Sequence, residues 1–245
     1  MMNKKPSPPI PDFSLSIFFP IYNDWATVAS LVAQSIMAAE KLTDDFEVIL
    51  VDDGSEEKTQ KVLTFLESTF SRVRVIHHEK NRGYGGALRT GFRESKKKYI
   101  FYTDGDAQYD VTELQNLAAA LDETVDIVNG YKIKRNDPIY RVWIGKIYHL
   151  VSRFLFNLPI RDVDCDFRLI RRELFDSINL TSTSGTICVE MVYKLARNGA
   201  SFREVPVRHY FRASGKSQFF NFKRLFRVAR DYAVIWYKLV VLKKE

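Results

Sequence analysis

The chain has 245 residues, of which 46% are hydrophobic and 27% charged, and its formal net charge is +7. This length suits one large domain, and the composition argues against a wholly disordered chain. The positive charge is concentrated, because the segment 203–245 holds eleven Lys and Arg against three acids. Such a local basic segment favours a membrane surface or a phosphate group as partner and argues against a nucleic-acid-binding protein.

Three features bear on the cellular location. Cys165 and Cys188 have neither C-x-x-C spacing nor a nearby His cluster, so we expect two buried thiols in a reducing compartment. Residues 1–13 contain four prolines and no apolar core of signal-peptide length, which predicts a disordered N-terminal lead. No stretch approaches the roughly 20 apolar residues that span a bilayer. The predicted location is cytoplasmic, with peripheral attachment to the cytoplasmic face of a membrane as an option.

The first half of the chain alternates strand-like and helix-like segments. Apolar runs predict strands at Leu15–Phe19, Glu47–Val51, Val73–Ile76, Tyr99–Thr103 and Asp126–Gly130. Helical spacing predicts helices at Thr27–Leu42, around Val62–Leu66, at Gly85–Phe92 and at Thr112–Leu121. Strands separated by helices of this length predict an α/β fold with a Rossmann-like, mostly parallel sheet flanked by helices.

The second half is less regular. It predicts helices at Ile139–Phe156 and Thr186–Arg197, an extended segment at Phe202–Tyr210 and an acidic loop between the helices. The tail 219–245 alternates aromatic and basic residues with helical period, which predicts an amphipathic helix. This helix is expected either at a membrane interface or packed on protein. The predicted organisation is the lead 1–13, one domain over 14–218 and the C-terminal helix 219–245.

Asp104 and Asp106 directly follow the predicted strand Tyr99–Thr103. In a parallel sheet, ligands bind beyond the carboxyl ends of the strands. Two carboxylates that converge at a tight turn suit Mg²⁺ or Mn²⁺, either of which can also bind a diphosphate. Asp and Gly are common in ordinary turns as well. The position after an apolar strand nevertheless favours a metal site.

Two further segments reach the same edge of the predicted sheet. In V-D-D-G-S, Asp52 can hold a base or a ribose hydroxyl, whereas Asp53 and Ser55 can be explained as caps of the next helix. The glycine-rich loop Asn81–Ala87 matches neither a dinucleotide-binding nor a Walker A pattern. For that loop we expect close backbone packing near a ligand.

In this order, P-I-Y-N-D from Pro20, V-D-D-G-S, N-R-G-Y-G-G-A and D-G-D-A-Q resemble the family 2 inverting glycosyltransferases of GT-A fold. The likeness covers about residues 14–217 and is nearest to the dolichol-phosphate mannosyltransferase and polyprenyl-phosphate glycosyltransferase branch. It implies Mg²⁺ or Mn²⁺ as cofactor, a UDP- or GDP-sugar donor and a polyprenyl-phosphate acceptor. The implied nucleotide and phosphate contacts are Pro20, Tyr22, Asp24, Asp52, Lys132, Arg212 and Lys216, and the implied metal and diphosphate ligands are Asp104, Asp106 and Gln108.

The sequence does not decide whether the acceptor is a lipid phosphate or a sugar hydroxyl. Asp162 and Arg168 fall where the family has D-x-x-x-G-F-R near the acceptor, with Asp166 in place of the glycine. A lipid phosphate is ionised near neutral pH because its second pKa is about 6, so it needs no general base. A sugar hydroxyl needs one, and Asp162 is the first candidate. A hydroxyl acceptor is therefore one alternative, and a non-catalytic nucleotide-sugar-binding module is another. Glu190 matches a family acid or is an exposed helical charge.

Overall fold

The computed structural model describes residues 10–134, 150–212 and 222–243, and its centre is a seven-stranded sheet of order β3-β2-β1-β4-β6-β5-β7. The strands are β1 Leu15–Ile21, β2 Phe46–Asp52, β3 Val73–His77, β4 Tyr99–Thr103, β5 Ile127–Lys134, β6 Phe167–Arg171 and β7 Phe202–Arg208. β6 runs antiparallel to both of its neighbours, and the other pairs are parallel. The predicted α/β fold with a mostly parallel sheet is confirmed.

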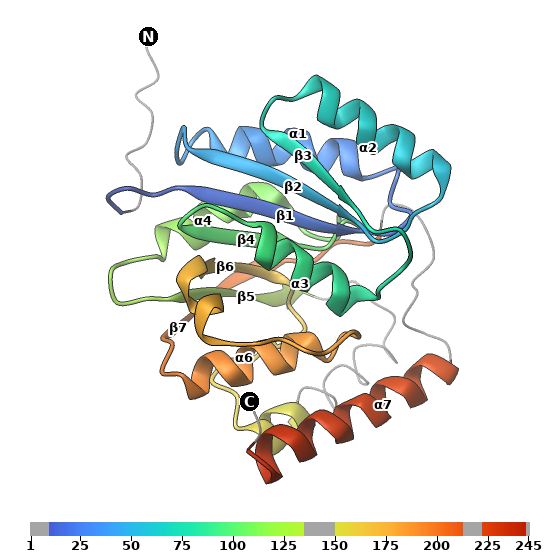
Figure 1. The fold of residues 1–245 in the computed structure, drawn as a ribbon. Helices are drawn as coiled ribbons and strands as arrows, with labels where there is room; N and C mark the ends of the chain where they lie inside the picture. The colour runs from blue at the N-terminus through green and yellow to red at the C-terminus, as the bar shows by residue number, and fades with distance from the viewer. Residues whose placement is uncertain (1–9, 135–149, 213–221, 244–245) are drawn as a thin grey trace.

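Helices cover both faces of the sheet (Figure 1). Their bounds are α1 Val28–Ala39, α2 Glu57–Thr69, α3 Tyr84–Glu94, α4 Leu114–Ala119, α6 Ile187–Arg197 and α7 Phe222–Trp236, with shorter helical segments at 150–156, Val111–Glu113, Arg172–Ser177 and Tyr237–Val241. One apolar core lies between the sheet and α1, α2 and α4. The second lies between the sheet and α3, α6 and α7.

β1 continues through Pro20, where the sequence predicted its end, and it is buried along its whole length. Its pairing with β4 ends at Phe18↔Tyr102, whereas its pairing with β2 continues to Ile21↔Asp52. At Pro20 the strand is therefore paired on one side only, and such an edge tolerates a residue without an N–H. This extension carries the chain past Pro20 towards the carboxyl edge of the sheet.

β6 was not predicted, because Arg168 interrupts its short apolar run. Of the predicted helix Ile139–Phe156, only 150–156 falls within the described residues, and this part is helical. The C-terminal segment is helical over Phe222–Trp236. No helix in the described ranges is long and apolar enough to cross a bilayer. Both cysteines are buried.

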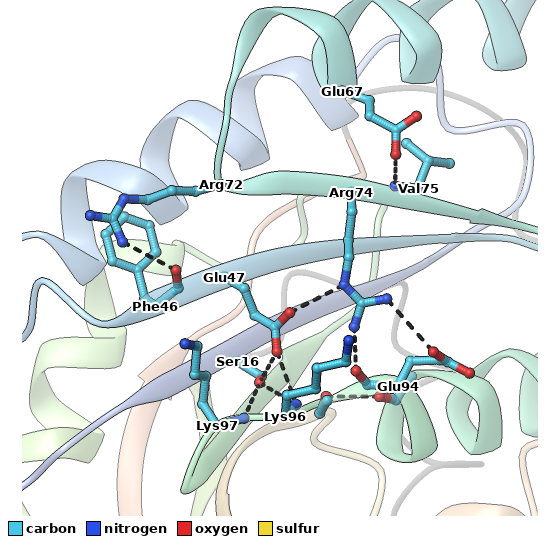
Figure 2. Close-up of polar contacts among 12 residues, drawn as sticks. Ser16, Phe46, Glu47, Glu67, Arg72, Arg74, Val75, Glu94, Lys96 and Lys97 are labelled. Atoms are coloured by element: carbon cyan, nitrogen blue, oxygen red, sulfur yellow. Dashed lines mark hydrogen bonds and ion pairs between the residues drawn. The ribbon is translucent and has the colours of Figure 1, made fainter.

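A polar network closes the amino-terminal edge of the sheet (Figure 2). Glu47 accepts hydrogen bonds from Ser16 Oγ at 2.7 Å, from Lys96 N–H at 2.9 Å and from Arg74 Nε at 3.2 Å. Burial alone would raise the pKa of Glu47, but these hydrogen bonds hold it below its usual value. The network ties β1, β2 and β3 to the chain between α3 and β4. The opposite, carboxyl edge carries the cavity described next.

Candidate functional site

A cavity of about 320 Å³ opens at the carboxyl ends of β1, β2 and β4. Its lining residues are Pro20, Ile21, Tyr22, Asp24, Asp53, Asn81, Gly83, Tyr84, Ala87, Asp104, Gly105, Asp106, Thr183, Ser184, Gly185 and Arg212. This volume lies within the range of small-molecule sites. The lining combines four aspartates with one arginine. The aspartates suit cations and hydrogen-bond donors of a ligand, and the arginine suits a negatively charged group.

Six of the residues predicted from sequence come together here: Pro20, Tyr22, Asp24, Asp104, Asp106 and Arg212. The Arg212 guanidinium joins two of the carboxylates, since Nη2 lies 2.6 Å from Asp106 Oδ2 and Nη1 lies 4.0 Å from Asp24 Oδ1. Asp24 also accepts a hydrogen bond from Tyr22 N–H at 3.2 Å. Segments following β1, β4 and β7 thus meet through charged side chains.

The carboxylates crowd one another in a desolvated place. Burial raises the pKa of Asp24 to about 6, and the nearby Asp106 charge adds to this rise. Burial and the charges of Asp166 and Asp106 raise the pKa of Asp104 well above its usual value. Tyr84 O–H donates to Asp104 Oδ1 at 2.7 Å and opposes that rise in part. The pKa of Asp106 is raised by burial, although Arg212 counteracts it.

These raised pKa values indicate carboxylates that lack enough positive charge around them. The described residues contain no group of three His, Cys, Asp or Glu arranged to hold a metal ion. Mg²⁺ in phosphate-transfer sites is, however, commonly bound by one or two carboxylates together with substrate phosphates. Asp104 and Asp106 fit that pattern, because both line the cavity and both follow β4 directly.

Asp52 is absent from the cavity lining, and its predicted contact with the nucleotide stays a prediction. Its Oδ1 accepts a hydrogen bond from Ser55 N–H at 2.9 Å, and its Oδ2 lies 2.8 Å from His77 Nδ1. Because successive residues of an extended chain point to opposite sides, Asp53 faces the other way. The structure places Asp53 on the cavity wall.

Gln108, Lys132 and Asp162 are also absent from the cavity lining. Gln108 Nε2 donates to Tyr210 O at 3.0 Å, which ties the turn after β4 to the segment after β7. Lys132 Nζ lies 3.7 Å from Asp162 Oδ1, and both side chains are buried. Lys216 lies outside the described residues. The sites predicted for these four residues therefore stay predictions.

One wall of the cavity was missed in the sequence. It consists of Thr183, Ser184 and Gly185, which carry no recognisable motif. Gly85 N–H donates to Thr183 O at 3.0 Å, and a Cβ on Gly83, whose φ is +81°, would lie 2.5 Å from the same oxygen. The close backbone packing expected of the loop Asn81–Ala87 is confirmed, and its glycine spacing was the available signal for Tyr84.

Glu190 anchors this wall from α6. Its carboxylate is buried and accepts hydrogen bonds from Thr181 N–H at 3.0 Å and from Ser182 N–H at 2.8 Å. Lys194 Nζ lies 3.1 Å from it and is buried too. The structure therefore excludes an exposed helical charge at this position.

The family model of "Glycosyl transferase family 2" matches residues 16–178. The chain belongs to glycosyl transferase family 2. An undecaprenyl-phosphate 4-deoxy-4-formamido-L-arabinose transferase of Pseudomonas fluorescens is 27% identical over 212 residues, which are 86% of this chain and 62% of the relative. The transferase of the same name from Salmonella choleraesuis is 27% identical over 218 residues, 89% and 65% of the two chains. The chain thus spans less than two thirds of the length of these relatives.

Solved structures show the same fold in other glycosyltransferases. Glucosyl-3-phosphoglycerate synthase from Mycobacterium tuberculosis, in complex with Mn²⁺, UDP and phosphoglyceric acid, matches with a TM-score of 0.69 at 16% identity, over 92% of this chain and 78% of that chain. A mannosyltransferase from Pyrobaculum calidifontis, in complex with GDP-Man and Mn²⁺, matches with a TM-score of 0.68 at 18% identity, over 97% and 66% of the two chains. The predicted GT-A fold is confirmed.

In this family 2 chain, Arg168 is buried in the sheet and is absent from the cavity lining. Its guanidinium is fully buried, donates to Asp166 Oδ1 at 2.8 Å and contacts the Tyr102 hydroxyl. Cys188 S–H donates to the same Asp166 oxygen at 3.1 Å. Asp166 is therefore a buried, paired acid.

Proposed function

We propose that this chain transfers a sugar from a nucleotide-diphosphate sugar to a polyprenyl phosphate, with inversion at the anomeric carbon. The observation that carries the proposal is that Asp53, Asp104, Asp106 and Arg212 line the same cavity at the carboxyl edge of the sheet. The printed names of the curated relatives support an undecaprenyl-phosphate type of acceptor. Two structural neighbours bound to UDP or GDP-Man support the donor class.

The charges suggest how the donor lies. The diphosphate belongs near Asp104, Asp106 and Arg212, where a divalent cation and the guanidinium can balance its charge. Asp53 would repel a diphosphate, but its carboxylate can accept a hydrogen bond from a nucleobase N–H or a ribose O–H. We therefore assign the nucleoside to the Asp53 side of the cavity. Lys216, predicted to close over the phosphates, belongs to the same proposal.

A divalent cation is the proposed cofactor, held by Asp104 and Asp106. The two aspartates fit a cation because burial, with a smaller contribution from neighbouring carboxylates, raises their pKa values, and a bound positive charge stabilises their ionised forms. When bound, the cation neutralises the negative charge of the departing nucleoside diphosphate. Mn²⁺ in both neighbouring structures supports this choice, and Mg²⁺ suits the same oxygen ligands.

The position of Asp162 supports a phosphate acceptor over a hydroxyl acceptor. A hydroxyl must lose its proton to a base that reaches it. Asp162, the predicted base, is buried against Lys132 and does not line the cavity. A phosphate oxygen attacks without that help, because it is already ionised near neutral pH.

The test is a transfer assay with Mn²⁺, a panel of UDP- and GDP-sugars and either a polyprenyl phosphate or sugar hydroxyl acceptors. The proposal expects release of nucleoside diphosphate only when the lipid phosphate is present. Release of nucleoside diphosphate with a sugar hydroxyl acceptor alone would show that the acceptor is a hydroxyl and not a polyprenyl phosphate. Donor binding without any transfer would favour a non-catalytic binding module.

We further propose that the chain meets the bilayer through a surface formed by helix 150–156 and α7 with its C-terminal extension. The short helix (yellow in Figure 1) lies against α7 (red), where Trp236 Nε1 donates to Leu155 O at 3.2 Å. Phe154 is 86% exposed and Leu150 69% exposed, and Tyr237, Val241 and Leu242 are exposed on the neighbouring element. The basic side chains of Arg153, Lys238 and Lys243 are exposed on the same elements. This combination suits an anionic lipid surface.

Vesicle flotation tests this surface. Phe154→Glu should reduce binding to vesicles that contain phosphatidylglycerol, whereas Phe65→Glu on α2 should not. Phe65 is a matched control because it is also an exposed aromatic residue, at 64%, but lies on the other face of the sheet. Equal binding of the two variants would contradict the proposal.

A further inference from the structure

Two Asp–His pairs lie side by side at the carboxyl ends of β2 and β3. Asp52 Oδ2 lies 2.8 Å from His77 Nδ1, and Asp53 Oδ1 lies 2.7 Å from His78 Nδ1. The two pairs have the same chemistry, but only the second includes a residue of the cavity wall. His77 is partly exposed, with 45% of its side chain accessible, whereas His78 is buried at 2%.

The hydrogen bonds of His78 fix its role. A carboxylate oxygen accepts a hydrogen bond, so we assign the ring proton to Nδ1, which donates to Asp53 Oδ1. Nε2 then accepts a hydrogen bond from Thr90 O–H at 2.9 Å. The ring is thereby held at both nitrogens between α3 and the end of β2.

Asp53 is held mainly through one of its two oxygens. Its Oδ1 accepts from His78 Nδ1 and also from Arg82 N–H at 2.8 Å. Within the described residues, both of these hydrogen bonds reach Oδ1, so Oδ2 is left for the cavity that Asp53 lines. A carboxylate fixed in this way presents one acceptor in a defined direction, which favours ligand binding because less side-chain freedom is lost.

We propose that His78 is a positioning residue for donor binding, which holds Asp53 so that its second oxygen meets the nucleoside. This inference rests on the proposed function, since it takes the ligand to be a nucleotide sugar. Without the Nδ1–H donor, the Asp53 side chain can rotate away from the direction that the nucleoside requires. We expect the affinity for the nucleotide to fall while the fold is kept.

Two substitutions of His78 separate positioning from packing. In His78→Asn the side-chain amide can place an N–H where Nδ1 stands, so the hydrogen bond to Asp53 can be kept. In His78→Gln the amide reaches the position of Nε2 instead, so that hydrogen bond is lost. Titration calorimetry of UDP and of GDP, each with MnCl₂, should show binding about tenfold to a hundredfold weaker for His78→Gln. Binding by His78→Asn should stay within about threefold of the unchanged protein.

His77→Gln is the matched control, because it breaks the neighbouring Asp–His pair and should leave nucleotide affinity unchanged. Equal weakening by His78→Asn and His78→Gln would overturn the proposal in favour of packing alone, and unchanged binding by both would overturn it too. If His78→Gln does not fold, the Thr90→Val variant tests the positioning role instead. It removes only the hydroxyl that orients the ring, so weaker binding supports the proposal and unchanged binding overturns it. If the unchanged protein binds neither UDP nor GDP, the proposed function fails and this inference fails with it.

Discussion

Replacing Glu190 by Gln tests whether one buried carboxylate holds the cavity wall formed by residues 183–185. The carboxylate accepts two backbone N–H groups of residues 181 and 182 and pairs with Lys194 at 3.1 Å. Burial raises the pKa of Glu190, but these hydrogen bonds and Lys194 outweigh it and lower the pKa below the usual 4.5. A glutamine has no charge and only one accepting oxygen. It therefore leaves the buried ammonium without its counter-ion.

Breaking a buried ion pair by removing one partner costs about 3 to 5 kcal/mol of unfolding free energy. For a chain of this size, that corresponds to a fall in melting temperature of about 6 to 20 °C. Urea unfolding followed by circular dichroism gives the free energy, and UDP or GDP titration should show weaker binding because the wall is loosened. The contribution of a carboxylate with a lowered pKa is present above its unfolded pKa and lost as the pH falls through its folded pKa. The difference between the two proteins should therefore shrink below about pH 4.

Glu57→Gln is the control for this experiment. Glu57 pairs with Lys61 at 2.6 Å, but both side chains are largely exposed, at 79% and 74%. Surface ion pairs contribute little to stability, so this variant should unfold like the unchanged protein. A loss of less than about 1 kcal/mol for Glu190→Gln, or equal losses in the two variants, would refute the reasoning.

Three further predictions concern the cavity. Asp104→Asn and Asp106→Asn should each weaken Mn²⁺ binding by about tenfold or more in calorimetry, since each removes a charged ligand; unchanged affinity would exclude the proposed cation site. Burial raises the pKa of Asp24 to about 6 and raises those of Asp104 and Asp106, so protons compete with the cation. Mn²⁺ affinity should therefore fall as the pH is lowered from about 7.5 to about 5.5, and a flat profile would contradict this. Gly83→Ala should destabilise more than Gly199→Ala in urea unfolding. Both glycines have a positive φ, +81° and +85°, but only Gly83 has a carbonyl oxygen 2.5 Å from the added Cβ.

The sequence predicted the sheet and the position of Asp104 because both depend on local patterns. An apolar strand followed by D-G-D places carboxylates at a carboxyl edge whatever the rest of the chain does. The sequence favoured Asp52 over Asp53 as the ligand contact, but a shift of one residue reverses the side of the sheet that a side chain faces. Only the register Asp52↔His77 and the partners of each acid fix that choice.

Other parts of the site depend on contacts between distant segments. Thr183 lines the cavity because Gly85 binds its carbonyl group and Glu190 holds the residues before it. Neither contact can be predicted from the spacing of residues in the sequence. Arg168 is similar, because a charged residue inside a central strand is stable only with Asp166 and Asn129 beside it.

The cavity is lined by residues from both the first and the last part of the chain, and this determines when the cavity can be completed during synthesis. The segment that the family model matches ends at residue 178, so a nascent chain of that length already carries Asp53, Asp104 and Asp106. It still lacks Arg212, which pairs with Asp106, and the part of the lining at residues 183–185. The complete cavity lining can therefore assemble only after translation has passed Arg212.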